Sequence, residues 1–371
     1  MKLLLISFLF FFTINSALAQ NNPYSFFVAG HVYGKPGVNN TGVHPPFKQK
    51  FSYIQSRPEI ILGVFTGDIV FPNPVAQDWD EIDADIDTLG LPVYFAVGNH
   101  DMENRPLYES RYGDTYYSFL LEGDLFIVLD PNIDEWNISG DQLTFFDTTL
   151  TNHADQVDNI FVFFHQLLWW ESDNIYAGYN PNSFAGRADS INFWSEIEPL
   201  AHQLSNNVVF ITGDIGSAPW SSDFMYDNYD NITFIASGMG DVNGENFVVV
   251  NIDSTNSLSY DLICLGDTDM NCFGELTDYQ ISEVISVNEI MDIKDNVTLF
   301  PNPATHSFNI QFNREINATV QIFDIKGQLL IEEKNDYNTL HQVNVTHLNS
   351  GIYFVRISDE NTNKVIKLIV N

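Results

Sequence analysis

The stretch VYFAVGNHD, residues 93–101, holds the strongest indication of the fold. Its first five residues, Val93–Val97, form a near-continuous apolar run, which is typical of a strand buried on both faces. Three polar side chains, Asn99, His100 and Asp101, follow it after a single glycine. In layered α/β folds, functional residues gather where strands end in loops, so these three side chains are the first candidates for a site.

Similar short apolar runs, rich in Val, Ile and Phe, recur before and after this stretch. They are Phe26–Ala29, Ile60–Phe65, Leu125–Leu129, Ile160–Phe164, Val208–Ile211, Ile232–Ala236 and Phe247–Ile252. Amphipathic stretches at Asp78–Leu89, Gly140–Leu150 and Asn192–Leu204 are predicted to form helices between these strands. An alternation of buried strands and helices predicts a layered α/β domain.

Four further motifs accompany apolar runs of this kind. They are AGHVYG (Ala29–Gly34), TGDI (Thr66–Ile69), FFHQ (Phe163–Gln166) and TGDIG (Thr212–Gly216). Together with GNHD they supply the candidate metal ligands, which are His31, Asp68, Asn99, His165 and Asp214. Carboxylate, amide and imidazole donors in one set suit zinc, iron or manganese. Such a metal lowers the pKa of bound water and binds phosphoryl oxygens, so the set predicts metal-dependent hydrolysis.

His100 and Asp101 are the candidate catalytic residues. His100 directly follows Asn99 and is predicted to point away from the metal. There it can stabilise developing charge or donate a proton to the leaving oxygen. Asp101 is predicted to orient the His100 imidazole.

The order TGD, GNHD, a strand-ending His and a strand-ending TGDxG resembles the calcineurin-like metallophosphoesterase family over residues 24–263. The pattern of that family is D-x-H, G-D, G-N-H-[DE], H and G-H-x-H. The resemblance implies a four-layer α/β/β/α sandwich of two packed sheets, and a hydrolase of phosphate mono- or diesters that uses metal-activated water. It also implies that Asp68 bridges two metals and that Asn99 and His165 are ligands. His100 takes the place of the catalytic histidine of the family.

The chain departs from the family pattern at three positions. Ala29 stands in place of the first Asp, Asp214 in place of the first His of G-H-x-H, and Gly216 in place of the second. These departures leave two interpretations of the function. The first is a metallophosphoesterase with a partly degenerate metal site. The alternative is a catalytically weak or inactive binding protein that retains the phosphoesterase scaffold.

The ligands that remain predict one or two cations per chain, with unequal affinity. Four ligands remain for the first cation, which are Asp68, Asn99, His165 and Asp214. Only His31 and the shared Asp68 remain for the second, so it should bind weakly or not at all. His44, in GVHPPF, is a candidate to compensate by folding back toward this side.

The formal charge of −34, from 49 acidic and 15 basic residues among 371, restricts the partners. A surface of this sign repels nucleic-acid phosphates and anionic membranes. We therefore expect a small phosphoester as the substrate, and no nucleic acid. With 44% hydrophobic residues the chain can bury a substantial core, and its length fits one large and one small domain.

Residues 1–20, MKLLLISFLFFFTINSALAQ, are typical of a secretory signal peptide. Lys2 provides the positive start, and a small-x-small cleavage site at Ala17 and Ala19 follows the apolar run. The predicted signal peptide is therefore residues 1–19, with an N-terminal membrane anchor as the alternative. The run is too short for a stable transmembrane segment, and no later stretch reaches the length of one.

Beyond residue 265 the composition changes. Residues 266–295 are polar without strong periodicity, and are predicted to link a domain at residues 20–265 to a second domain at residues 296–371. Seven short apolar runs, several of them alternating, predict that the second domain is a β-sandwich. These runs are Val297–Phe300, Phe308–Phe312, Thr319–Phe323, Leu329–Glu332, Gln342–Val345, Ile352–Ile357 and Lys364–Val370.

Four fragments of this second domain resemble the type A sorting domain of the type IX secretion system. They are LFPNPA (Leu299–Ala304), VQIFDIKGQLL (Val320–Leu330), LNSGIYFVRI (Leu348–Ile357) and KVIKLIV (Lys364–Val370). The resemblance implies a Gram-negative bacterium and the type IX secretion machinery as a partner. It also implies export through the periplasm to the cell surface or the medium.

Several other side chains have two alternative roles. Aromatic residues near the later motifs either wall a substrate cleft or pack in the core. They are Trp169, Trp170, Tyr176, Tyr179, Trp194 and Trp220. Arg187 either binds a phosphate or forms a surface ion pair. Cys264 and Cys272 favour a local disulfide, because two cysteines alone cannot close a zinc site.

Overall fold

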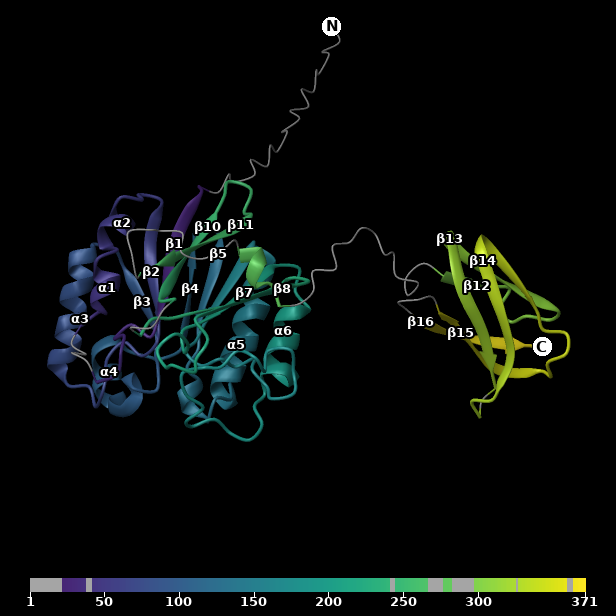
Figure 1. The fold of residues 1–371 in the computed structure, drawn as a ribbon, viewed down its shortest axis with the longest axis horizontal. Helices are drawn as coiled ribbons and strands as arrows, with labels where there is room; N and C mark the ends of the chain where they lie inside the picture. Colours follow the sequence, from purple (N-terminus) through teal and green to yellow (C-terminus); the bar gives the residue numbers. More distant parts are fainter. Residues whose placement is uncertain are drawn as a thin grey trace, which may run out of the picture. The chain divides into compact units, whose positions relative to one another are not determined.

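A computed structural model shows two compact units, Met1–Val284 and Ile285–Asn371 (Figure 1). The described residues are 22–37, 42–240, 244–265, 276–281, 297–324, 326–358 and 363–371. The predicted signal peptide, residues 1–19, lies outside them, as do Cys272 and most of the predicted linker. Cys264 is disulfide-bonded. No helix of the described residues is long and apolar enough to cross a membrane.

Two mixed sheets form the centre of the first unit. The order of the first sheet is β11 (Leu258–Cys264), β10 (Asn246–Ile252), β1 (Tyr24–Gly30), β2 (Ile60–Thr66) and β3 (Val93–Ala96). The order of the second is β4 (Tyr117–Leu121), β5 (Asp124–Val128), β6 (Asn159–Phe163), β7 (Asn207–Thr212), β9 (Ile232–Ser237) and β8 (Phe224–Tyr229). Strands β1, β2 and β3 pair in parallel, as do β6 and β7. Parallel strands end at the same edge of a sheet, so the motifs that follow them gather there.

The two sheets pack face to face, and helices cover their outer faces (Figure 1). Between the sheets, the Phe26 ring contacts Phe126 and Phe161, with centroids 5.1 and 4.8 Å apart. The first sheet is covered by α1 (Pro45–Lys48), α2 (Phe51–Gln55), α3 (Ala76–Leu89) and α4 (Arg105–Tyr112). The second is covered by α5 (Gly140–His153) and α6 (Glu198–His202). These layers are the expected α/β/β/α sandwich, whose strands bury both faces as continuous apolar runs predict.

Two of the three predicted helices form as single helices, and the third is divided in two. Helix α3 begins where the Asp78 carboxylate accepts from the Val75 N–H at 2.7 Å, and it ends before Gly90, whose φ is +77°. The predicted helix Asn192–Leu204 is divided into a π-helical turn, η4 (Phe193–Ile197), and α6. Pro199, at the start of α6, has no N–H to continue a regular helix across this point. The 3-10 turns are η1 (Asp101–Asn104), η2 (Pro131–Ile133), η3 (Ala154–Gln156) and η5 (Leu276–Tyr279).

Two glycines let the sheets meet at the edge that carries the motifs. Gly30 ends β1 of the first sheet, and Gly213 follows β7 of the second. A Cβ built on Gly30 would lie 2.3 Å from the Gly213 Cα, and one built on Gly213 would lie 2.2 Å from the Thr66 carbonyl oxygen. Only glycine permits this approach, which brings the motifs of both sheets together.

The described residues of the second unit form five antiparallel strands. They are β12 (Val297–Phe300), β13 (Ser307–Phe323), β14 (Leu329–Asn344), β15 (Gly351–Ser358) and β16 (Asn363–Val370). The prediction of seven short strands is wrong, because β13 and β14 each join two of the predicted runs. Both halves of β13 contribute to one apolar core, which includes Phe308, Ile310 and Ile322. The unit is therefore all-β, as expected.

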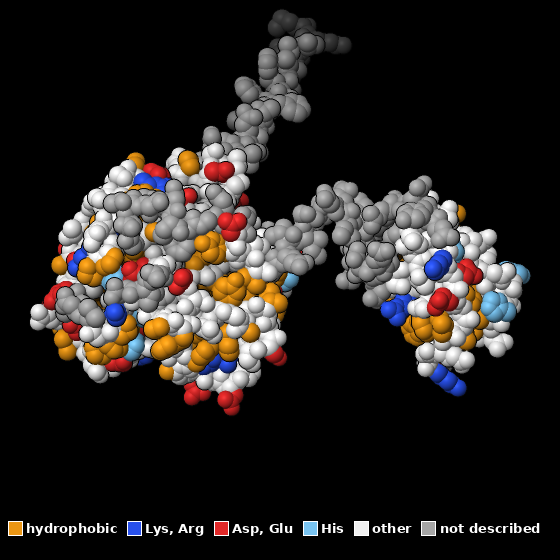
Figure 2. All heavy atoms as spheres, in the orientation of Figure 1, with side chains coloured by type: hydrophobic (Ala, Val, Ile, Leu, Met, Phe, Trp, Pro, Cys, Tyr) orange, Lys and Arg blue, Asp and Glu red, His pale blue; other side chains and the backbone are white. Residues whose placement is uncertain are grey.

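Figure 2 shows how charge is distributed on one face of each unit. Acidic side chains are scattered among apolar and neutral ones on that face, rather than gathered into one patch. The whole chain has a formal charge of −34. A field of this kind repels polyanions at long range.

Candidate metal centre

The predicted motifs meet in a cavity of about 330 Å³ where the strands of the first unit end. Its lining includes five of the predicted residues, which are His31, Asp68, Asn99, His100 and Asp214. His31 follows β1, Asp68 follows β2 and Asp214 follows β7, so both sheets contribute. His165, which follows β6, is fully buried beside Asp68 and Asp214.

His165 is the residue around which the candidate ligands gather. Its Nδ1 lies 2.9 Å from the Thr66 carbonyl oxygen, which can only accept, so Nδ1 carries a proton. Its Nε2 lies 3.4 Å from Asp68 Oδ1 and 3.7 Å from Asp214 Oδ1, and has no hydrogen-bond partner among the described residues. The Asp214 N–H donates to the His165 carbonyl oxygen at 3.0 Å, which keeps these two residues together. A buried Nε2 that faces two carboxylates is arranged to hold either a proton or a cation.

Burial and mutual interaction shift the pKa values of the buried acidic and histidine side chains at this site. Burial lowers the pKa of His165, but the Asp68 and Asp214 carboxylates outweigh burial and raise it to about 10. Burial raises the pKa of Asp214 to about 8. Burial also acts to raise the pKa of Asp68, but the imidazoles of His165 and His31 hold it well below its usual range. Burial lowers the pKa of His31 to about 4. A cation that binds at His165 therefore has to displace a proton.

Two of the candidate ligands have strained backbone conformations. His31 has a φ of 53° and Asp68 a φ of 49°, in the left-handed region that residues other than glycine rarely adopt. Gly98 of the GNHD motif packs against the Asp68 turn, where an added Cβ would lie 2.2 Å from Asp68 Oδ1. Strain of this kind persists only where the surrounding structure enforces it, and it collects at functional sites.

The side of the cavity expected to hold a second cation has few donors. Ala29 and Gly216 offer no side-chain donor. His31 Nε2 lies 3.5 Å from Asp68 Oδ2 and 3.0 Å from Ser217 Oγ. The sequence prediction missed Ser217, because a single serine just beyond the TGDIG motif has no distinctive spacing.

His44 does not complete this side of the cavity. Its Nε2 lies 2.8 Å from Glu245 Oε1, and both side chains are buried. His44 is also absent from the described residues that line the cavity. The suggestion that it compensates for the lost ligands is therefore wrong.

His100 is oriented by Glu103, and the prediction that Asp101 orients it is wrong. The Nδ1 atom of His100 lies 2.7 Å from Glu103 Oε1. Asp101 is fully buried, and its Oδ1 accepts from two backbone N–H groups of the loop after β2, while its Oδ2 accepts from that of Gly98. Asp101 therefore ties together the loops that follow β2 and β3, and its role is structural.

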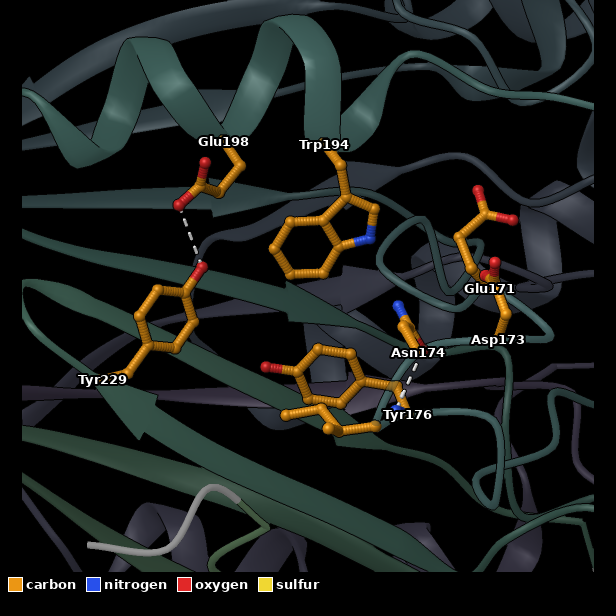
Figure 3. A pocket seen from close by; sticks show the side chains of 8 residues that line it. Glu171, Asp173, Asn174, Tyr176, Trp194, Glu198 and Tyr229 are labelled. Carbon is orange, nitrogen blue, oxygen red and sulfur yellow. Dashed lines mark hydrogen bonds between the residues drawn. The ribbon is translucent and has the colours of Figure 1, made fainter. Parts of the chain in front are cut away.

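Most of the aromatic residues near the later motifs pack in the core. Tyr176 stacks on Trp194 with ring centroids 5.8 Å apart. Figure 3 shows these two rings near Tyr229, whose hydroxyl donates to Glu198 at 3.0 Å, in a separate hollow of about 620 Å³. None of the described residues lines both this hollow and the cavity of the candidate ligands. Trp220 differs from the other aromatic residues, because it does line that cavity.

Arg187 is engaged within the protein. Its Nη2 lies 2.8 Å from Glu171 Oε1 and donates to the Trp170 carbonyl oxygen at 3.2 Å. Its guanidinium lies 5.5 Å from the centroid of the Trp170 ring. The sequence predicts that Arg187 either binds a phosphate or forms a surface ion pair, and the structure shows an ion pair. The side chain of Arg187 is, however, largely buried.

The distances around His165 Nε2 can be compared with those of a metal site. Ligand atoms about 2 Å from zinc in a tetrahedral site lie about 3.4 Å apart, close to the distances from His165 Nε2 to the two carboxylates. The described residues contain no group of three or more His, Cys, Asp and Glu side chains already gathered as a metal-binding cluster. Asp68 and Asp214 place carboxylate oxygens near His165 Nε2, and Asn99 lines the same cavity.

Comparison with known proteins finds similarity to two families, each over part of the chain. Calcineurin-like phosphoesterases match residues 31–198, and the secretion system C-terminal sorting domain matches residues 298–371. The first match includes Asp68 and Asn99 but ends before Asp214, where the motif departs from the family pattern.

Two curated relatives match shorter parts of the chain. An endo-acting ulvan lyase from Formosa agariphila is 31% identical over 88 residues, which are 24% of this chain and 17% of that protein. An ulvan lyase from Nonlabens ulvanivorans is 36% identical over 78 residues, which are 20% of this chain and 14% of that protein. The matched part is less than a fifth of either relative, and neither alignment is long enough to cover residues 31–198.

Proposed function

We propose that this chain, which carries a calcineurin-like phosphoesterase domain and a type IX sorting domain, hydrolyses small phosphate mono- or diesters with one divalent cation. The cation is zinc, iron or manganese. Its ligands are Asp68, Asn99, His165 and Asp214. The observation that carries the proposal is the buried His165 Nε2, which faces two carboxylates and has no hydrogen-bond partner among the described residues. The sorting domain marks the protein as secreted or attached to the cell surface.

The residues of the chain position the substrate and move a proton. When bound, the cation lowers the pKa of a water molecule and neutralises charge on phosphoryl oxygens. His100 lines the cavity, and Glu103 accepts from its Nδ1, which fixes the ring. In its protonated form the His100 imidazole donates a proton to the ester oxygen that leaves. The backbone N–H of His100 also donates to Asp68 Oδ1 at 3.2 Å. This bond holds the loop that carries His100 beside the candidate ligand Asp68.

The size and charge of the cavity favour a small ester. A volume of about 330 Å³ accommodates a phosphoryl group with a modest organic substituent. Lys35 lines the cavity together with Asp68 and Asp214, in a chain whose formal charge is −34. The Lys35 ammonium group offsets part of the repulsion of a phosphate by these carboxylates and by the rest of the surface.

A catalytically weak binding protein that keeps the phosphoesterase scaffold is the second candidate. The observation that favours it is the second-cation side of the cavity, where His31 Nε2 contacts Ser217 Oγ and Gly216 offers no donor. A single cation lacks the two-sided clamp on the phosphoryl group. We therefore expect slow turnover even if the first proposal is correct.

Hydrolysis of phosphoesters by the purified secreted protein tests the proposal. We expect the protein to release phenol slowly from phenyl phosphate or diphenyl phosphate. A chelator should abolish the release, and added zinc, manganese or iron should restore it. The reason is that the proposed reaction needs a bound cation to activate the attacking water. A protein that contains its metal and hydrolyses neither ester contradicts the proposal and favours the binding protein.

A further inference from the structure

Trp220 is an exposed aromatic side chain beside the candidate ligands. Its exposed fraction is 67%, and it lines the same cavity as Asp68, Asp214 and His100. Tryptophan combines a large apolar face with one polar N–H, which makes an exposed and well-positioned indole a strong anchor for a ligand. The placement of this ring at a polar cavity is therefore informative.

Asn182 holds the indole ring in place. Trp220 Nε1 donates to the Asn182 carbonyl oxygen at 3.1 Å. The Asn182 N–H donates to the Asp214 carbonyl oxygen at 2.8 Å, and its Oδ1 accepts from the N–H groups of Ser217 and Ala218 at 2.8 and 3.2 Å. One residue thus connects the exposed ring to a candidate ligand, so the ring has a defined position relative to the site.

The side-chain amide of Asn182 holds the loop beneath the indole ring. Asn182 is only 8% exposed and lines the cavity. Because its Oδ1 is held by two backbone N–H groups, its Nδ2 faces the other way, toward the Asp214 carboxylate. Asn182 therefore braces the loop that carries Trp220 against the candidate ligand Asp214 by backbone and side-chain contacts.

We propose that Trp220 determines the specificity of the site by stacking on the organic group of the substrate, so that the protein prefers phosphoesters whose organic group is a planar aromatic ring. The inference rests on the proposed function, because it names the substrate class of the same site. Stacking does not depend on net charge, so it provides affinity that the acidic surface does not oppose. Asn182 fixes the ring beside the cavity, because its carbonyl oxygen accepts from Trp220 Nε1.

Binding of two phosphonates tests this proposal without requiring turnover. Phenylphosphonate and methylphosphonate share the phosphoryl group but differ in the ring, and neither has an ester bond to hydrolyse. Titration calorimetry of the full mature protein should show that phenylphosphonate binds about tenfold more tightly, as expected from stacking and apolar burial. Trp220→Ala should reduce this preference to about twofold or less, whereas Trp220→Phe, which retains a ring, should keep most of it.

Leu120→Ala is the matched control, because Leu120 is 52% exposed on β4 and does not line the cavity. It should leave the preference unchanged. If Trp220→Ala keeps the preference of the wild type, or the wild type has none, the specificity proposal is overturned. If the wild type prefers phenylphosphonate but hydrolyses neither phenyl nor methyl phosphate, the proposed function fails while the aromatic subsite stands.

Discussion

Replacing His100 by alanine should slow phosphoester hydrolysis by about 100-fold or more while the protein keeps its bound cation. A positioned general acid contributes about 10² to 10⁴ to the rate of such a reaction. His100 lines the cavity, but its Nδ1 is bonded to Glu103, and it is not one of the four proposed ligands. The turnover rate at saturating substrate and the metal content should be measured on the same preparation.

His202→Ala is the matched control for this variant. His202 ends α6, where its ring contacts Glu198 and Asp230, and it does not line the cavity. The control should therefore retain both rate and metal. A His100→Ala variant that hydrolyses esters at the wild-type rate would show that another group protonates the leaving oxygen. Loss of the metal together with the rate would instead identify His100 as a ligand.

Deleting residues 297–371 should keep the protein inside the cell envelope. The secretion sorting-domain family matches residues 298–371, and we expect export to depend on this domain. The apolar core of this domain is built from residues between Val297 and Val370, while the cores of the first unit use none of them. The truncated chain should therefore fold and accumulate in the periplasm, as an immunoblot of periplasm, membrane and medium would show.

The reciprocal fusion controls for misfolding of the truncated chain. Residues 285–371, which form the second unit, should carry an unrelated exported protein to the cell surface or the medium. A cooperative thermal transition of the truncated chain would show that it is folded. Normal release of the truncated chain into the medium would contradict the assignment of the sorting domain.

The layered fold could be predicted because its strands are buried on both faces. Burial on both faces requires continuous apolar runs, and these runs remain visible in the sequence. Val93–Val97 and the GNHD motif are the clearest example, since the run becomes β3 and the motif becomes the loop that follows it. The second unit was harder to predict, because its long strands pass through polar stretches that interrupt the apolar pattern.

The parts of the site that come from loops could not be predicted in the same way. Asp101 and Glu103 both follow His100 closely, and the sequence cannot show which carboxylate faces the ring and which faces the backbone of another loop. Asn182 lies outside every motif, and only the folded loops bring its N–H to the Asp214 carbonyl oxygen. Such contacts depend on tertiary packing rather than on the periodicity of a strand or helix.

The number of metal ions bound per chain tests the central claim most directly. Elemental analysis by mass spectrometry should be applied to the purified wild-type protein and to Asp214→Ala at matched concentrations. The account predicts close to one ion per wild-type chain, and a large loss in Asp214→Ala, because that variant removes one of the two carboxylates that face His165 Nε2. Two ions per wild-type chain, no ion at all, or an Asp214→Ala variant that retains its metal would contradict it.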